Sequence, residues 1–139
     1  MTDSKCIELV IQRFIGECIN NRKLDIVDEL FSPEYVNNAA TPDISPDLDG
    51  YKQRLSYMLQ AFPDLHITIE DIFSAGDKVA IRLTANGTHQ GQGMGIPASG
   101  KHAIWTATAI YRVVGGRIIE RWENRDDLGL LRQLQATTD

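Results

Sequence analysis

The spacing of apolar residues changes once along this chain of 139 residues, and that change limits the folds that the chain can adopt. Up to Phe62, apolar side chains recur every three or four residues, which places them on one face of a helix. From Leu65 onward they alternate with polar residues, which is typical of strands with one covered face. Helices followed by strands predict an α+β fold in which the helices cover one face of a curved sheet.

Three helices are predicted before residue 64. The second is followed by Pro33, which breaks a helical path, and the third can be capped by Asp47 and is ended by Pro63. Between these two helices, the turn-forming residues predict a short extended segment over 35–38 and a surface loop over 39–48. The first helix is expected to end near residues 20–21, the second to cover 24–31, and the third to cover 48–62.

The second part of the chain is predicted to hold strands that are joined by tight turns. Ala75-Gly76-Asp77 is typical of a hairpin turn, and a second glycine turn at 115–116 joins a strand over 102–114 to the last strand. Residues 91–95 are glycine-rich, but they lack the Gly-Lys-Ser/Thr ending of a phosphate-binding loop and open no helix. We interpret them as a flexible loop beside a ligand-binding mouth.

Composition and charge exclude several classes of protein. The formal net charge is −5, and no run of Lys and Arg is interleaved with aromatic residues. Nucleic acids and anionic membranes are therefore not expected as partners, because either needs a clustered positive field. No apolar run approaches the ~18 residues of a membrane span, and the first residues carry no positively charged leader. The sequence predicts one domain, residues 1–139, in the cytoplasm.

The cysteine and histidine residues predict neither a disulfide nor a metal site. Cys6 and Cys18 lie on the first predicted helix, where twelve positions at ~1.5 Å each separate them by roughly 18 Å. A disulfide needs Cα atoms within ~7 Å. The 3 histidines have no ligand-like spacing. Nucleophilic catalysis has no support either, because the chain lacks Gly-x-Ser-x-Gly and has no Cys near a His.

Two segments carry a recognisable pattern. Residues 88–101 read Thr-His-Gln-Gly-Gln-Gly-Met-Gly-Ile-Pro-Ala-Ser-Gly-Lys. Residues 116–134 read Gly-Arg-Ile-Ile-Glu-Arg-Trp-Glu-Asn-Arg-Asp-Asp-Leu-Gly-Leu-Leu-Arg-Gln-Leu. Together with the Tyr-Arg pair at 111–112, these segments resemble the SnoaL-like polyketide cyclases, a branch of the NTF2-like superfamily that is also called ester cyclases.

The resemblance implies both a fold and a reaction. The fold is the NTF2-like cone, in which N-terminal helices pack on a strongly curved, mainly antiparallel sheet that encloses a pocket. The reaction is an aldol-type ring closure of a hydrophobic polyketide ester by acid–base catalysis, with no metal and no other cofactor. The implied ligand is a small hydrophobic molecule with carbonyl groups. The implied partner is a second copy of the chain, bound through the outer face of the sheet.

Asp126 stands where the resembled cyclases carry their general acid/base, four residues after Trp122. Burial against apolar walls such as Trp122 and Leu130 would raise the pKa of a carboxyl there, which suits it to proton transfer. Residue type alone favours another role for Asp126, the N-cap of a C-terminal helix, and Asp127 is a neighbouring rival. His89 matches the Thr-His of the pattern and could orient the substrate or share proton transfer, or it could simply be solvated.

Further residues are predicted to contact the substrate. Asn38 stands where the family often has His, or it is a turn residue that satisfies its own backbone. Arg112 ends its strand where some relatives place a donor for the ligand carbonyl. Glu120 could face the cavity or form a salt bridge, and the salt bridge is the favoured interpretation. The other predicted contacts are apolar or aromatic: Phe14, Met58, Phe62, Met94, Trp105, Tyr111, Trp122 and Leu130.

The resemblance leaves the reaction open, because this superfamily uses its cone for several activities. One alternative is a non-catalytic module that binds a small apolar molecule. The other is an epoxide-opening or hydroxylating relative. Epoxide opening would need a second carboxylate with an Arg between the two, and Arg125 beside Asp126 is the nearest equivalent in the sequence.

Overall fold

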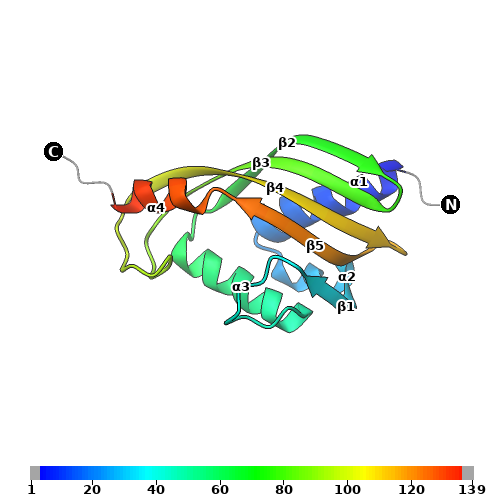
Figure 1. Ribbon diagram of the computed structural model, residues 1–139, viewed down its shortest axis with the longest axis horizontal. Helices are drawn as coiled ribbons and strands as arrows, with labels where there is room; N and C mark the ends of the chain where they lie inside the picture. The colour runs from blue at the N-terminus through cyan, green and yellow to red at the C-terminus, as the bar shows by residue number, and fades with distance from the viewer. Residues whose placement is uncertain (1–3, 136–139) are drawn as a thin grey trace.

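The computed structural model describes residues 4–135 and has an α+β fold (Figure 1). The helical elements are α1 (Ser4–Arg13), the π-helical η1 (Phe14–Asn20), the 3-10 turn η2 (Leu24–Ile26), α2 (Val27–Leu30), α3 (Leu48–Ala61) and α4 (Asp127–Gln135). The strands are β1 (Phe31–Asn37), β2 (His66–Ala75), β3 (Lys78–Thr88), β4 (His102–Val114) and β5 (Arg117–Arg125). Within the described residues, no helix combines the length and the apolarity that crossing a membrane would take.

The strands form one curved sheet in the order β1-β5-β4-β3-β2. β1 runs parallel to β5, and every other neighbouring pair is antiparallel, so the mainly antiparallel sheet predicted from the sequence is confirmed. In Figure 1, α1 lies behind β2, β3 and β4, and α3 runs below β5. The helices and the sheet thereby enclose a common core. α4 packs against β4 at the end of the chain that the structure describes.

The structure corrects the predicted boundary at Phe31. The second helix was expected to include this residue, but the helix ends at Leu30 and Phe31 begins β1, where it pairs with Ile118 and is fully buried. Pro33 lies inside the strand. An edge strand tolerates proline, and the pairing of β1 with β5 is irregular between Phe31 and Val36.

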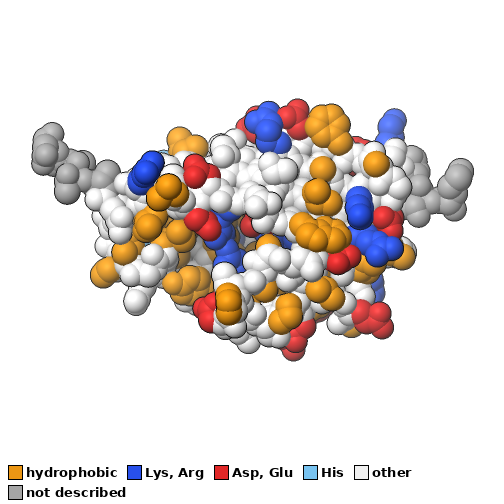
Figure 2. Space-filling model, in the orientation of Figure 1, with side chains coloured by type: hydrophobic (Ala, Val, Ile, Leu, Met, Phe, Trp, Pro, Cys, Tyr) orange, Lys and Arg blue, Asp and Glu red, His pale blue; other side chains and the backbone are white. Residues whose placement is uncertain are grey.

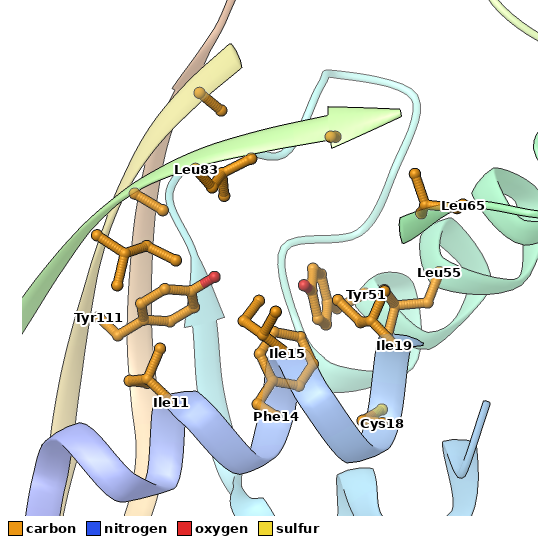
Figure 3. Packing of buried hydrophobic residues seen from close by; sticks show 14 of the residues in the cluster. Ile11, Phe14, Ile15, Cys18, Ile19, Tyr51, Leu55, Leu65, Leu83 and Tyr111 are labelled. Atoms are coloured by element: carbon orange, nitrogen blue, oxygen red, sulfur yellow. The ribbon is translucent and has the colours of Figure 1, made fainter. Parts of the chain in front are cut away.

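Side chains on β4 alternate between the core and the outer surface. The buried positions include Ala103, Trp105, Ala107, Ala109 and Tyr111, in keeping with the alternation expected from Leu65 onward. The aromatic rings pack against η1 and α3, with the ring centroids of Phe14 and Tyr111 6.2 Å apart (Figure 3). Ala107, a small residue between the two large rings, leaves room on the inner face of the sheet and lines the cavity described next.

Candidate active site

An apolar cavity lies between the helices and the inner face of the sheet. Its inner compartment has ≈ 530 Å³ of unfilled space, including the part that is open to solvent, and a neighbouring outer compartment has ≈ 390 Å³ on the same measure. The two compartments adjoin at four residues that line both: Arg54, Met58, Trp105 and Arg125.

The walls of the inner compartment are mainly apolar and aromatic. They come from η1, α3, β3 and β4, which cover the space from opposite sides. In the outer compartment Phe62 lies against Trp105, with ring centroids 5.0 Å apart. A molecule bound here would be largely separated from water, which strengthens electrostatic contacts inside the cavity. The main apolar lining residues of the inner compartment are Phe14, Ile15, Ile19, Tyr51, Leu55, Met58, Leu65, Leu83, Trp105 and Tyr111.

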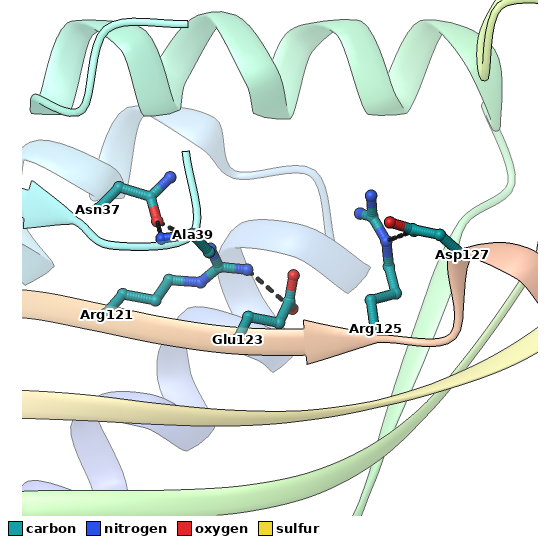
Figure 4. A network of polar contacts seen from close by, with 6 residues as sticks. All are labelled: Asn37, Ala39, Arg121, Glu123, Arg125 and Asp127. Atoms are coloured by element: carbon teal, nitrogen blue, oxygen red, sulfur yellow. Dashed lines mark hydrogen bonds and ion pairs between the residues drawn. The ribbon is translucent and has the colours of Figure 1, made fainter. Parts of the chain in front are cut away.

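One strand, β5, brings three charged side chains to the cavity. Successive strand residues point to opposite faces, so Arg121, Glu123 and Arg125 share the inner face. Nη2 of Arg121 lies 2.8 Å from Oε2 of Glu123, and Nη1 donates to Oδ1 of Asn37 at 3.2 Å (Figure 4). Nε of Arg125 pairs with Asp127 at 2.5 Å. Among the residues that line the two compartments, Glu123 is the carboxylate that could exchange a proton with a ligand.

Several buried donors near Arg121 have no partner among the described residues. They are Nε of Arg121, the hydroxyl of Tyr35 and Nδ2 of Asn37. A buried donor without a partner costs about 1–3 kcal/mol, so a ligand oxygen that reached Arg121 would relieve part of this penalty. Burial also raises the pKa of Tyr51 and of Tyr111, which both line the inner compartment. Their phenols therefore stay protonated at neutral pH and can act as donors.

His89 is fully buried and holds the glycine-rich loop. Its Nδ1 accepts a hydrogen bond from the backbone N of Ser99 at 3.1 Å, so the ring proton lies on Nε2, which is 3.2 Å from the carbonyl oxygen of Gly93. The alternative of a solvated His89 is therefore wrong. The ring lines neither compartment, but it fixes the loop whose Gly93 and Met94 line the outer one. A part for His89 in proton transfer stays a prediction.

Asp126 is exposed at the junction of β5 and α4. Its Oδ1 accepts a hydrogen bond from the backbone N of Gly129 at 2.9 Å, which is the bond of an N-cap. The side chain borders a hollow that also involves Arg82, not the apolar cavity. The expected burial against Trp122 and Leu130 is wrong, because β5 ends at Arg125 and the chain turns there into α4. Catalysis by Asp126 stays a prediction, whereas its geometry is that of a cap.

The structure separates the other predicted contact residues into two groups. The cavity is lined by Phe14, Met58, Phe62, Met94, Trp105, Tyr111 and Leu130. It is not lined by Asn38, Arg112, Glu120 and Trp122.

Outside the cavity, Glu120 forms the predicted salt bridge. Its carboxylate lies 3.9 Å from Arg112 and accepts a hydrogen bond from Nδ2 of Asn38 at 3.0 Å. Arg112 also pairs with Asp77 at 2.8 Å. Trp122 lies opposite Ile110 on the outer face of the sheet. Asn38 and Arg112 thus both contact Glu120 outside the cavity, and a substrate contact by these residues or by Trp122 stays a prediction.

An irregularity in strand pairing explains why the sequence did not predict that charged residues of β5 line the cavity. Val113 pairs with Ile118 but Arg112 pairs with Glu120, so Ile119 is an extra residue in β5. The bulge reverses the alternation of faces: Ile118 is buried before it, and Arg121 is buried after it. The charged residues at 121, 123 and 125 alternate with other residues, and this alternation was the signal in the sequence that the three share one face of β5. Nothing in the sequence marked Arg54 as part of the cavity.

Comparison with known proteins agrees with this architecture. A family model described as SnoaL-like polyketide cyclase matches residues 9–134. The chain is 30% identical over 132 residues to aklanonic acid methyl ester cyclase DnrD of Streptomyces peucetius, covering 92% of this chain and 89% of DnrD. The similar enzyme DauD of Streptomyces sp. strain C5 is also 30% identical, covering 92% of this chain and 80% of DauD. The solved structure of TsrD from Streptomyces laurentii superposes with a TM-score of 0.88 at 27% identity, covering 99% of this chain and 100% of TsrD.

Proposed function

Because the chain belongs to the SnoaL-like polyketide cyclase family, we propose that it catalyses an aldol-type ring closure of a hydrophobic, polyketide-like ester without a cofactor. The observation that carries this proposal is the position of Glu123. Its carboxylate lines an apolar cavity beside the buried guanidinium of Arg121 and two protonated tyrosines. A general base, donors for an oxyanion and exclusion of water are the three requirements of the reaction.

Each step of the proposed reaction has a group that can perform it. Glu123 would take a proton from the carbon between two carbonyl groups, and the electron pair would move to the carbonyl oxygen to form an enolate. Arg121, Tyr51 and Tyr111 could donate to that oxygen. The enolate carbon would then attack a second carbonyl of the same molecule and form the new C–C bond. The resulting alkoxide would regain the proton from Glu123, so the enzyme returns to its starting state.

The test compares two carboxylates in one assay. The wild type, Glu123→Gln and Asp126→Asn are incubated with a panel of aromatic polyketide methyl esters, and ring closure is followed as a new chromatographic retention time at unchanged mass. Loss of a general base typically lowers turnover by about 10²–10⁴-fold, and we expect this loss for Glu123→Gln. Glu120→Gln is the matched control, because Glu120 lies on the same strand but outside the cavity. Circular dichroism checks that every variant is folded.

The outcomes separate the role of Glu123 from the cyclase function. If Glu123→Gln kept full turnover and Asp126→Asn lost it, Asp126 would be the acid/base group. The proposed cyclase function would still hold. Absence of turnover by the wild type on every ester, with retained ligand binding, would favour a non-catalytic binding module. One observation favours this second candidate: the carboxylate of Glu123 is already paired with Arg121 at 2.8 Å, so a ligand would have to compete with this ion pair for its oxygens.

We further propose that two copies of the chain associate through the outer face of the sheet. Figure 2 shows hydrophobic side chains spread across this layer of strands. The strand register places Phe73, Ala80, Ile110 and Trp122 in one row across β2, β3, β4 and β5. Phe73 is 67% exposed. Ile110 is also exposed, and a row of apolar residues that solvent reaches supports an interface. A cytoplasmic location, expected from the sequence, is likewise proposed and would be checked by cell fractionation.

A further inference from the structure

The cavity is positively charged, although the protein as a whole is acidic. Four charged residues line the two compartments: Arg54, Arg121, Arg125 and Glu123. Three cations face one anion, in a chain whose formal net charge is −5. In Figure 2 basic side chains lie recessed in a hollow between the end of β5 and α3. Solvent can reach this hollow, so a ligand could enter the cavity past positive charge.

Arg54 is the charged cavity residue that has no ion-pair partner between residues 4 and 135. Glu123 is paired with Arg121, and Arg125 is paired with Asp127, whose side chain is exposed. Arg54 forms no hydrogen bond and no ion pair with any residue between 4 and 135. It is only partly exposed and stands on α3, where it lines both compartments. A guanidinium in this position has donors free for a ligand that spans the junction of the compartments.

The surroundings of Arg54 disfavour its charge. Burial lowers the pKa of Arg54 from its ordinary value, and repulsion by Arg125 lowers it further, while Glu123 acts in the opposite direction. Asp43, in the loop before α3, is close enough for electrostatic attraction to Arg54. It is exposed, however, and the described residues show no ion pair between the two side chains. An anion bound beside Arg54 would offset both the burial and the repulsion.

We propose that the ligand of this cavity carries a carboxylate, which Arg54 and Arg125 bind at the junction of the two compartments. The proposal rests on the cavity being the ligand site of the proposed function, and it adds the charge of the ligand. Arginine suits this task because its planar fork matches both oxygens of a carboxylate. The aromatic walls on either side of the junction, Trp105 among them, would hold the hydrophobic body of the same molecule.

The experiment compares two ligands that share a ring system and carry either a charged carboxylate or a neutral methyl ester at the same position. Anthraquinone-2-carboxylate and its methyl ester have the same planar ring system, and isothermal titration calorimetry gives the Kd of each. We expect the wild type to bind the carboxylate at least tenfold more tightly than the ester. Arg54→Gln should abolish the preference while changing the Kd of the ester less than threefold. Arg54→Lys, which keeps the charge but not the fork, should retain part of the preference.

The matched control is Arg112→Gln, since Arg112 is an arginine outside the cavity and should leave both Kd values unchanged. Equal affinity of the wild type for the two ligands, tighter binding of the ester, or no binding of the carboxylate would overturn the proposal. So would an unchanged preference in a folded Arg54→Gln variant. The ring-closure assay tests the cyclase function separately. If the wild type turned over neutral esters but did not bind the carboxylate more tightly than the ester, the proposed carboxylate on the ligand would be wrong and the proposed cyclase function would still hold.

Discussion

Replacement of Asp126 tests whether this residue is a helix cap or an acid/base group. Its Oδ1 accepts a hydrogen bond from the backbone N of Gly129, and its own carbonyl oxygen accepts the first helical bond from Leu130 at 3.1 Å. Loss of an N-cap to alanine typically costs about 1 kcal/mol. Because the site is exposed, water can partly replace the lost acceptor, so we expect Asp126→Ala to lower the free energy of unfolding by about 1 kcal/mol and no more.

Asparagine provides the matched replacement, since its side-chain oxygen caps a helix as well as aspartate does. Asp126→Asn loses only the attraction between a negative charge and the helix N-terminus, which is worth roughly 0.3–1 kcal/mol at an exposed site. We therefore expect Asp126→Asn to be less destabilising than Asp126→Ala, which loses the capping hydrogen bond as well as the charge. Turnover by Asp126→Asn should stay within about threefold of the wild type, because a capping residue contributes nothing to proton transfer.

Gly129 supplies an internal check of the cap. A Cβ atom at this position would lie 2.1 Å from Oδ2 of Asp126, so Gly129→Ala must displace the capping carboxylate. Alanine is otherwise better than glycine in a helix by about 1 kcal/mol. We expect no gain from Gly129→Ala alone, but a gain of up to about 1 kcal/mol from the same change in the Asp126→Ala background. Such coupling can arise only if the two residues meet as the structure places them.

Urea denaturation followed by far-ultraviolet circular dichroism measures the free energy of unfolding of the wild type and the four variants. A loss of 1 kcal/mol corresponds to a fall in Tm of roughly 4 °C for a domain of this size. Unchanged stability of Asp126→Ala, together with stabilisation by Gly129→Ala alone, would refute the cap. A fall in turnover of several orders of magnitude in a fully stable Asp126→Asn would show instead that Asp126 is catalytic.

Two further predictions concern the outer face of the sheet and the thiols. The wild type should sediment as a dimer. The double variant Ile110→Glu, Trp122→Glu places two charges in the proposed interface, so it should sediment as a 15.5 kDa monomer. A monomeric wild type would contradict the proposed dimer. Burial raises the pKa of Cys18 to about 11, whereas Cys6 is exposed, so a thiol titration at pH 8 should count one thiol in the native protein and two after denaturation. Two thiols that react at once in the native state would contradict the buried position of Cys18.

Local sequence predicted the elements whose patterns are local. The alternation along β4 and the cap of α3, where Asp47 accepts from the backbone N of Gly50 at 2.9 Å, both depend on residues close together in the chain. The start of β1 did not follow from local pattern. Phe31 continues the apolar spacing of the preceding helix, and it becomes a strand residue only because it pairs with Ile118, far along the sequence.

The cavity was harder to predict than the fold for a similar reason. The side chains of β5 could be assigned to faces only with knowledge of the bulge at Ile119, which appears when β4 and β5 are paired. Alternation counted from Ile118 without the bulge would put Glu120 and Trp122 in the cavity, and the sequence analysis named both of them as contacts. A shift of one residue moves every later side chain to the opposite face.

The residues that carry the family resemblance serve mainly to hold the scaffold together. His89 fixes the glycine-rich loop, and a Cβ atom at Gly91 would lie 2.2 Å from the backbone oxygen of Gln60, so only glycine allows the loop to approach α3 this closely. Asp126 and Gly129 form the cap of the last helix. The pattern therefore specifies where the cavity lies and how its loop is held.

The proposed chemistry of the cavity depends on residues that the resemblance did not single out. Glu123 and Arg125 lie in the second segment but were not predicted as site residues, and Arg54 lies outside both segments. Two chains could share the scaffold residues and differ at these three positions, and they would then enclose similar cavities of different charge. The charge of the ligand and the identity of the base should accordingly follow from the side chains at 54, 123 and 125, and family membership alone would not determine them.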